Sequence, residues 1–298
     1  MRDDFQSLRV VVCRPALPKD TADVMELTRE IWEGHDYVLH VWAEWLADAQ
    51  GVLAVAEYAG KVVGLAKLSY KGAGEWWMQG LRVHPAYQGQ GVASRLHDYI
   101  LNYWQRRLDR VLRLATSSAR LPVHHLCERS GFSKVGEYLS YVAPALEGQA
   151  HGFVPVKEEE APFALEYALK NPMHSLSFGF MDLSWYWGEL TLERITDAIR
   201  QGHALWGMDH GGRRWALLVF DLDDDEEGDY PYIQYLACDV KQLEGALVEY
   251  RRLAGALGYR RCAWMAPDRA QILTALQEAG FQSDWENSLY LFEKRSLS

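Results

Sequence analysis

The apolar and polar positions of the first half of the chain fall into short apolar runs and helix-period segments. Apolar runs are typical of buried strands, whereas apolar residues three and four positions apart indicate one face of a helix. The apolar runs predict strands at residues 8–13, 52–58, 62–70, 76–83, 111–116 and 132–142. Two helix-period segments precede residues 52–58, and one follows each of 76–83 and 111–116. The predicted order is therefore strand, two helices, three strands, helix, strand, helix, strand.

A glycine-rich stretch joins the predicted strand 76–83 to a helix that begins near Val92. Pro85 ends the strand pairing because proline has no N–H group to donate. Gly89 and Gly91 allow a sharp turn and leave the backbone amides uncovered. Uncovered amides at the positive end of a helix attract anions, so the natural ligand is a phosphate-bearing cofactor.

Two familiar kinds of phosphate-binding loop do not fit this stretch. A P-loop requires Lys and then Ser or Thr after its second glycine, but Val92 follows Gly91 here. A dinucleotide-binding loop requires a third Gly or Ala, where Ser94 stands, and an acid at the end of the next strand. Asp109 has about the right spacing but precedes the predicted strand 111–116, so it lies at the wrong end.

A third kind of loop is found in the GCN5-related N-acetyltransferases, abbreviated GNAT. The stretch Gln88-Gly89-Gln90-Gly91-Val92-Ala93 resembles their Gln/Arg-x-x-Gly-x-Gly/Ala loop, and the preceding Leu81–Pro85 resembles the family as well. The predicted order of elements over residues 8–143 is also similar to that family. The alternative, a surface turn that binds nothing, fits this wider context less well.

The resemblance implies a fold, a cosubstrate and a set of contacts. The implied fold is α+β (α/β), with a mixed, mostly antiparallel sheet flanked by helices. The implied cosubstrate is acetyl-CoA, whose pantetheine arm is expected to pair with the strand edge at Leu81, Arg82 and Val83. The pyrophosphate is expected on the backbone amides of Gln88, Gly89, Gln90, Gly91, Val92 and Ala93.

The second half of the chain repeats the first half faintly. Leu-Val-Glu-Tyr at 247–250 corresponds to Leu-His-Asp-Tyr at 96–99, and Ala-Gly-Phe at 279–281 corresponds to Ser-Gly-Phe at 130–132. Similar spacing and a similar element order predict two tandem copies of one fold. The alternative is a chance similarity, because helix–strand alternation is common.

The two copies predict a domain organisation. We expect a catalytic domain at 1–145, a linker at 146–160 and a degenerate GNAT-like domain at 161–298. Residues 239–245 of the second copy lack paired glycines, so this copy is not expected to hold a pyrophosphate. Its expected work is structural, or the shaping of a substrate cleft.

The resemblance narrows at residues 30–38, Glu-Ile-Trp-Glu-Gly-His-Asp-Tyr-Val. Together with Gly80–Val83 and the loop-less second half, this block resembles the histidine N-acetyltransferase-like family. In that family Gly-x-Asp-Tyr opens the second helix, in the region where substrate enters, and our hypothesis is that Asp36 binds a substrate cation. The family usually has an acid where Gln79 stands, which leaves the base and the acceptor open. The residues expected to contact the amine substrate are His35, Asp36 and Tyr37.

Acetyl transfer to an amine requires an unprotonated nucleophile. For an amino-acid α-amine the pKa lies only about one to two units above neutral pH, so a modest base or a water chain is sufficient. Glu33 is the first candidate for that base, and the others are His35, Asp36, Glu75 and His84. The departing thiolate can take a proton from Cys127 or from Tyr138. The alternative for both residues is simple packing in the core.

Composition limits the partners and the compartment. The net charge of −10 and the lack of a basic tract argue against nucleic acid as a partner. The cysteines form no C-x-x-C pair, which fits a reducing compartment. No signal peptide and no membrane-spanning apolar stretch are visible, so we expect a cytoplasmic protein without a membrane partner.

No metal site is expected from the sequence. His124 and His125 are adjacent, and a helix would point neighbouring residues in different directions rather than at one ion. The acidic run 221–229 has Glu226 where a calcium loop needs glycine and Tyr232 where it needs glutamate. A solvated acidic loop between two strands is the better interpretation.

The sequence therefore predicts an acetyltransferase whose first copy is active. The expected acceptor is the primary amine of a small molecule, with a free amino acid as the first candidate. A second enzymatic alternative is a protein N-terminus, a polyamine or an aminoglycoside. A different class, a non-catalytic regulator that binds acyl-CoA, would carry the same loop. The oligomeric state stays open.

Overall fold

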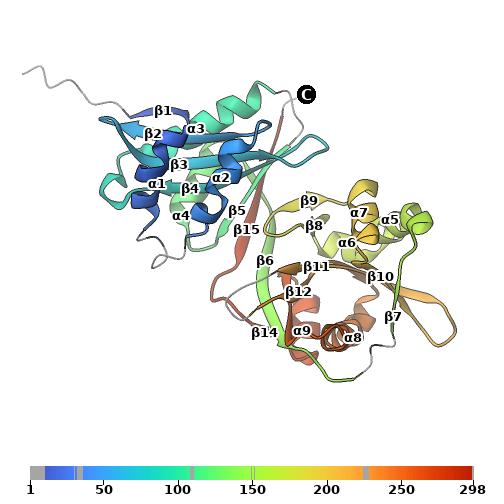
Figure 1. The fold of residues 1–298 in the computed structure, drawn as a ribbon. Helices are drawn as coiled ribbons and strands as arrows, with labels where there is room; N and C mark the ends of the chain where they lie inside the picture. Colours follow the sequence, from blue (N-terminus) through green and yellow to red (C-terminus); the bar gives the residue numbers. More distant parts are fainter. Residues whose placement is uncertain are drawn as a thin grey trace, which may run out of the picture. The chain divides into compact units, whose positions relative to one another are not determined.

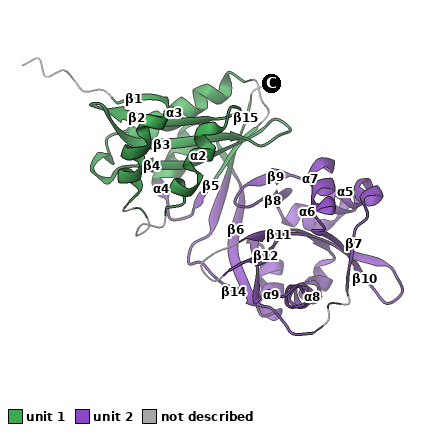
Figure 2. Cartoon of the chain, viewed as in Figure 1, with its two compact units in different colours: residues 1–114, 122–133, 292–298 green, residues 115–121, 134–291 purple. Residues whose placement is uncertain are grey.

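A computed structural model describes residues 11–29, 31, 36–107, 111–148, 150, 152–223 and 228–296 (Figure 1). The chain divides into two compact units (Figure 2). Unit 1 draws on residues 1–114, 122–133 and 292–298, and unit 2 draws on residues 115–121 and 134–291. Each unit therefore combines stretches that are far apart in the sequence.

Unit 1 is built on a mixed sheet with the strand order β1-β2-β3-β4-β5-β15. Its strands are β1 (Val12–Pro15), β2 (Val52–Tyr58), β3 (Lys61–Tyr70), β4 (Glu75–Val83), β5 (Val111–Ser117) and the last residues of β15 (Leu289–Arg295). β1 to β4 are antiparallel neighbours, whereas β4 and β5 run parallel. The helices are α1 (Thr21–Thr28), α2 (Val38–Ala47), α3 (Val92–Gln105) and α4 (Leu121–Arg129), with short 3-10 helices η1 (Pro18–Asp20) and η3 (Pro85–Tyr87).

Helices cover both faces of the unit 1 sheet. Leu65 of β3 belongs to a buried core cluster with Leu27 of α1 and Trp42 of α2. The neighbouring Gly64 points to the other face, since successive residues of a strand alternate. A Cβ on Gly64 would lie 2.9 Å from the carbonyl oxygen of Arg82 and 3.0 Å from Leu96 of α3, so α3 packs closely against this strand. α1 and α2 therefore cover one face and α3 covers the other.

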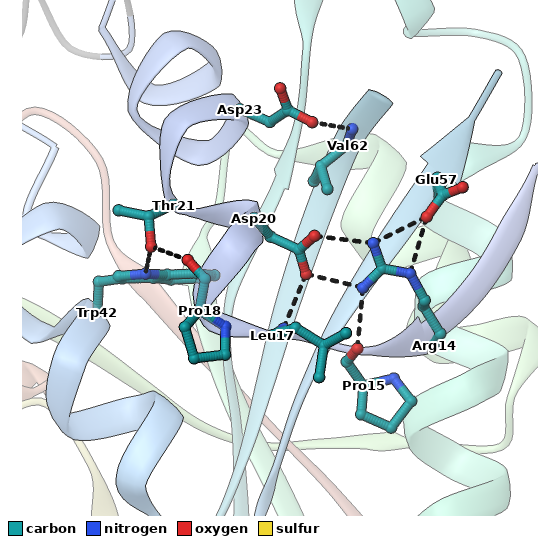
Figure 3. A network of polar contacts seen from close by, with 10 residues as sticks. All are labelled: Arg14, Pro15, Leu17, Pro18, Asp20, Thr21, Asp23, Trp42, Glu57 and Val62. Atoms are coloured by element: carbon teal, nitrogen blue, oxygen red, sulfur yellow. Dashed lines mark hydrogen bonds and ion pairs between the residues drawn. The ribbon is translucent and has the colours of Figure 1, made fainter. Parts of the chain in front are cut away.

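An ion-pair network fixes the first elements of unit 1 (Figure 3). The guanidinium group of Arg14 on β1 donates to the two carboxylate oxygens of Asp20 at 2.7 and 2.8 Å, and to Glu57 of β2 at 2.8 Å. Asp20 is buried, and its hydrogen bonds from Arg14 hold the pKa of the carboxyl below the usual value. Thr21, the first residue of α1, accepts a hydrogen bond from Trp42 of α2 at 3.0 Å. The network thus links the two helices to the edge of the sheet.

A second charge cluster lies in the interior of unit 1. Arg113 of β5 is only 1% exposed. Its guanidinium group donates to Glu75 of β4 and to Glu293 of β15, each at 2.7 Å. Both carboxylates are buried as well. Three strands are therefore joined by charges that compensate one another away from water.

Unit 2 contains a sheet with the strand order β6-β13-β12-β11-β10-β7, and β14 pairs with β6. These strands are β6 (Ser133–Pro144), β7 (Phe153–Pro155), β10 (Ala204–Met208), β11 (Arg214–Asp223), β12 (Tyr230–Cys238), β13 (Arg261–Pro267) and β14 (Gln282–Ser283). A separate hairpin consists of β8 (Phe180–Asp182) and β9 (Trp187–Glu189). The helices are α5 (Ala161–Lys170), α6 (Pro172–Leu176), α7 (Leu192–Arg200), α8 (Leu243–Ala256) and α9 (Ala270–Glu278), with 3-10 helices η4 (Glu158–Glu160) and η5 (Val240–Gln242).

The unit 2 sheet also has a buried core on each face. Leu218 of β11 belongs to the core that Leu247 of α8 and Leu276 of α9 complete. The neighbouring Leu217 belongs to the core that includes α5 and Ile195 of α7. Within the described part of the chain, no helix is both long and apolar enough to cross a membrane.

The structure confirms the predicted α+β class, with mixed and mostly antiparallel sheets flanked by helices. The element order of the first half is the predicted one, and several strand bounds agree to within one or two residues. The second half repeats this order from β7 to β15. It differs by an inserted hairpin, β8–β9, by a further helix among α5, α6 and α7, and by the short strand β14 between α9 and β15.

The sheets of the two units exchange their sixth strands. β6 follows α4 in the chain, yet it pairs with β13 in unit 2. β15 follows α9, yet from Phe292 onward it belongs to unit 1 and is ordered next to β5. A single cut at a linker does not describe this arrangement, and residues 153–155 of the expected linker form β7. The boundaries 1–145, 146–160 and 161–298 stay a prediction about separately folding domains.

The buried cluster of unit 1 generates a stability prediction. Arg113→Ala leaves two buried carboxylates without their shared cation, and breaking a buried ion pair typically costs about 3–5 kcal/mol of unfolding free energy. Urea unfolding measured by circular dichroism should show this loss. The matched control is Arg129→Ala, which removes an exposed pair with Asp98 and should cost at most about 1 kcal/mol. Equal losses in the two variants would contradict the prediction.

Candidate active site

β4 separates from its neighbour β5 partway along its length. The parallel ladder joins only Glu75–Trp77 of β4 to Val111–Arg113 of β5. Over the described residues the ladder ends there, while the other edge of β4 stays paired with β3 as far as Val83. A strand edge that leaves its ladder presents N–H and C=O groups that an extended ligand can pair with. This stretch contains the expected cosubstrate contacts Leu81, Arg82 and Val83.

A β-bulge lies in the same stretch of β4. Gly80 and Leu81 together face a single residue of β3, between the paired positions Gln79 and Arg82. Gly80 has a φ of +66°, and a Cβ there would lie 2.6 Å from the ring of Trp45. Both the left-handed backbone and the close ring require glycine. Since bulges redirect the groups beside them, the backbone of Leu81 is turned out of the regular ladder.

The turn at residues 88–91 connects this strand to α3. Gly89 and Gly91 have φ values of +72° and +78°, in the left-handed region that favours glycine. A Cβ on either glycine would meet no heavy atom within 4 Å, so the space over the turn is open. The two glutamine side chains of the turn fold back and donate to the carbonyl oxygens of Val83 at 3.3 Å and Ala86 at 3.0 Å.

α3 starts at Val92, directly after the turn, and Ala93 is its second residue. The first amides of a helix have no acceptor within the helix and carry the positive end of its dipole. Val92 and Leu96 are buried against the sheet, so the start of the helix is held in place. The open turn and the fixed helix start together have the form of a site for a pyrophosphate.

Asp36 and Tyr37 lie immediately before α2. Asp36 is 2% exposed, and its carboxylate accepts from Nε and Nη2 of Arg82 at 2.9 and 3.2 Å. It also accepts from the backbone N–H of Val38, the first residue of α2, at 3.1 Å. Tyr37 is 38% exposed; its ring stands edge-on to Trp45, and the Arg82 guanidinium carbon lies 5.4 Å from the ring centroid.

The Asp36–Arg82 pair changes the interpretation of Asp36. Direct contact with a substrate cation was expected, but this buried carboxylate already holds a guanidinium group. The geometry favours a positioning role, in which Asp36 joins the start of α2 to the edge of β4. The sequence did not suggest the pair because its members are 46 residues apart. The other two residues expected nearby, Glu33 and His35, lie outside the described residues.

Cys127 and Tyr138, the candidate acids, are both buried and belong to different units. Burial raises the pKa of the Cys127 thiol to about 12, which makes it a weaker acid than an ordinary thiol. Tyr138 belongs to unit 2, where its hydroxyl donates to the carbonyl oxygen of Ser177 at 3.4 Å. Its ring centroid lies 4.8 Å from that of Trp187. Packing is the favoured interpretation of both side chains.

Two further base candidates have structural partners. Glu75 belongs to the buried cluster around Arg113. The Nδ1 atom of His84 accepts from the backbone N–H of Ala86 at 3.2 Å and so shapes the chain before the turn. Among the residues that the structure describes, no group of three or more His, Cys, Asp or Glu could hold a metal ion.

The second copy differs in sequence and structure at the corresponding position. Its parallel ladder between β12 and β13 is also short, joining Tyr232 and Ile233 to Ala263 and Trp264. The chain then continues into η5 and α8 without a glycine turn. Asp239 caps η5 by accepting from the N–H of Lys241 at 2.9 Å, and Glu244 lies in the first turn of α8. Carboxylates at this point oppose a bound anion.

The fold and the turn together define a class of protein. Residues 21–132 match the family model described as Acetyltransferase (GNAT) family. This segment, which is less than half of the chain, is therefore similar to the GNAT family.

Two curated relatives are histidine N-acetyltransferases. The chain is 33% identical over 82 residues to the one from Oreochromis niloticus, which is 27% of this chain and 24% of that protein. It is 28% identical over 135 residues to the one from Xenopus tropicalis, which is 44% of this chain and 41% of that protein. The chain thus spans less than half the length of these curated relatives in the matches.

Solved structures resemble almost the whole chain. A GCN5-related N-acetyltransferase from Sphaerobacter thermophilus has a TM-score of 0.64 at 16% identity, covering 96% of this chain and 95% of that one. A GCN5-related glucosamine N-acetyltransferase region of a fungal β-N-acetylglucosaminidase has a TM-score of 0.68 at 14% identity, covering 98% and 39%. A tandem GNAT protein from the clavulanic acid biosynthesis pathway has a TM-score of 0.59 at 12% identity, covering 97% and 100%. These likenesses show the fold, including its tandem form.

The open space over the turn generates a binding prediction. A Cβ at each of Gly89 and Gly91 would occupy the space over the turn, so the double alanine variant should bind acetyl-CoA at least about tenfold more weakly. Isothermal titration measures this loss. The matched control is the double variant Gly60→Ala, Gly72→Ala. These glycines have φ values of +82° and +84° and open surroundings, so alanine causes similar backbone strain there. Equal weakening in the control would attribute the effect to strain alone and contradict the prediction.

Proposed function

We propose that this protein transfers an acetyl group from acetyl-CoA to the primary amine of a small molecule, with a free amino acid as the first candidate. The observation that carries the proposal is a single segment with an open β4 edge, two left-handed glycines and a helix start. The match of residues 21–132 to the GNAT family model supports this reaction, because enzymes of that family use acetyl-CoA. The relatives named histidine N-acetyltransferases support an amino acid as acceptor.

The proposed mechanism begins with the cosubstrate. The pantetheine arm pairs with the edge of β4 from Leu81 to Val83, and the amides of residues 88–93 hold the pyrophosphate. When the amine attacks the thioester, negative charge develops on the carbonyl oxygen. A backbone N–H group at the bulge, where β4 leaves its regular ladder, stabilises that charge. Both reactants are held together, so the transfer needs no covalent enzyme intermediate.

The reaction needs little help from the protein with proton transfer. The pKa of an amino-acid α-amine lies about one to two units above neutral pH, so only a small fraction of the amine is already unprotonated there. Attack forms an ammonium, which gives its proton to a base or to water as the tetrahedral intermediate collapses. The thiolate that leaves has an ordinary thiol pKa of about 8.5 and can depart without prior protonation. The mechanism therefore places no requirement on a buried acid such as Cys127.

Cys127→Ala should keep kcat within about threefold of the original value. Its thiol is buried and weakly acidic, so the substitution removes packing rather than a proton donor. The control is Cys238→Ala, because Cys238 is also buried and the pKa of its thiol is likewise raised to about 12. Steady-state kinetics compares the two variants. A loss of about a hundredfold or more in Cys127→Ala alone would restore the acid role.

Asp36→Asn should lower kcat through Arg82 rather than through the amine. The asparagine oxygen can still accept from Val38, but the ion pair is lost, and a loss of about tenfold is expected. Arg82→Gln should give a similar loss, and the double variant should lose little more, because both changes break one interaction. KM and kcat are measured for each variant. Direct substrate binding would give another result. Asp36→Asn would then raise KM for the amine, and it would raise KM by the same factor when Arg82→Gln is already present.

The reaction is tested by thiol release from acetyl-CoA. The acceptor panel contains free amino acids including histidine, polyamines, aminoglycosides and short peptides. Turnover with free amino acids is the expected result, and turnover only with another class would correct the acceptor. Binding of acetyl-CoA without thiol release for any acceptor would overturn the enzymatic proposal in favour of a regulator that binds acyl-CoA.

A further inference from the structure

Unit 2 contains a cavity of about 270 Å³. Its walls come from β6, β11, β12 and β13, from the end of β8 and the turn after it, and from the segment that follows β14. The volume is at the lower end of known ligand sites, so it suits a molecule of metabolite size. Polar and aromatic side chains in its walls include Asp182, Trp185, Asp223, Tyr232, Arg261 and Trp285.

The sheet forms one wall of this cavity. Ala263 and Met265 of β13 line it, whereas Trp264 between them belongs to the core that α8 and α9 cover. The cavity therefore lies on the opposite face from those helices. It lies where the β12–β13 ladder begins, with Arg261 as the first residue of β13. The candidate cosubstrate edge of unit 1 lies beyond the end of the β4–β5 ladder, so the two sites occupy different positions along the strands of their units.

Asp182 is the unusual residue of this cavity. It is 7% exposed, and the backbone N–H groups of Ser184 and Trp185 donate to its carboxylate. Its Oδ1 atom has no hydrogen-bond partner among the residues that the structure describes. A buried carboxylate oxygen without a donor carries a desolvation cost that a bound donor would relieve.

The charge around the cavity favours a cation. Three carboxyl groups line it, those of Asp182, Asp223 and Asp284, against one guanidinium group, that of Arg261, among the described lining residues. Arg261 itself lies over the ring of Tyr230, at 4.2 Å from the centroid. The local excess of carboxyl groups attracts a positive ligand and repels an anionic one.

Aromatic side chains stand at the same cavity. Trp185 and Trp285 stack with their centroids 5.0 Å apart and an interplanar angle of 21°. They are 46% and 37% exposed, although large aromatic rings are usually buried. Trp185 also has a φ of +66°, a backbone conformation that costs free energy in a residue with a side chain. Aromatic faces beside carboxylates are a typical environment for an organic cation.

We propose that the cavity of unit 2 binds a small organic cation, whose ammonium group donates to Asp182 and whose body lies against Trp185 and Tyr232. The ammonium supplies the donor that Oδ1 lacks and compensates the excess of carboxyl groups. The proposal is independent of the acetyl transfer proposed for unit 1, because every residue that carries it belongs to unit 2.

Binding at Asp182 is expected to release a proton. Burial raises the pKa of this carboxyl to about 8, so it is protonated at neutral pH in the empty cavity, and an ammonium favours its ionised form. Affinity should therefore rise by up to about tenfold per unit as the pH increases toward 8, and then level off. The charged and titratable groups facing it are Asp223 from β11, Tyr230 and Tyr232 from β12, Arg261 from β13 and Asp284 from the segment after β14.

Isothermal titration of the full-length protein without acetyl-CoA tests the proposal. The probes are tyramine, histamine, agmatine and putrescine, compared with tyrosol, in which a hydroxyl replaces the ammonium of tyramine. At pH 8.5 at least one cation should bind at least about tenfold more tightly than tyrosol. Asp182→Asn should abolish that preference and the pH dependence, because the amide carries no charge. Asp197→Asn, an exposed carboxylate on α7, is the matched control and should change neither.

Two further variants locate the binding. Trp185→Ala, at an exposed position, should weaken the binding of the cation at least about threefold. This variant tests the proposal if Asp182→Asn fails to fold. The double variant Gly89→Ala, Gly91→Ala should bind the cation as the original protein does, whatever happens to acetyl-CoA. A cation that binds no better than tyrosol, or a preference that survives in both Asp182→Asn and Trp185→Ala, would overturn the proposal.

Discussion

The separation of β4 from β5 is the constraint on which the candidate active site depends. Three residues of β4 pair with β5, and the strand then continues on β3 alone. The bulge in β4 requires glycine at position 80. The backbone there is left-handed, and the ring of Trp45 leaves no room for a side chain. The strand edge, the glycine turn and the start of α3 follow one another directly along the chain. Their relation is therefore set by local geometry rather than by a distant contact.

Paired charges hold the elements around this segment. Arg14 ties η1, and through it α1, to the edge of the sheet, and Arg82 ties the start of α2 to the bulged strand. Arg113 ties β4 to β5 where they are still paired and to β15. Such pairs are weak sources of stability, since their desolvation offsets much of their attraction. Each pair fixes which elements meet. The Asp36–Arg82 pair holds the start of α2 against the strand that the cosubstrate is proposed to use.

Local patterns made much of this fold predictable. Apolar runs and helical periods depend on neighbouring residues. The predicted bounds of β2 therefore agree with the observed ones, and six consecutive positions were enough to recognise the glycine turn. The exchange of β6 and β15 was missed, because it depends on which distant strands pair. The Asp36–Arg82 pair was missed for the same reason. The cavity of unit 2 is assembled from segments around residues 140, 182, 230, 261 and 284, and no single stretch of sequence carries its pattern.

The strand exchange gives the second copy a role that does not depend on the loop it lacks. Unit 1 completes its sheet with residues after Phe292, and Glu293 among them pairs with the buried Arg113. The sheet of unit 1 therefore cannot be completed until the whole chain is present. A chain that lost the second copy would also lose this strand and leave a buried guanidinium with one carboxylate fewer. The fold of unit 1 thus depends on a strand that follows unit 2 in the chain, whether or not unit 2 binds a pyrophosphate.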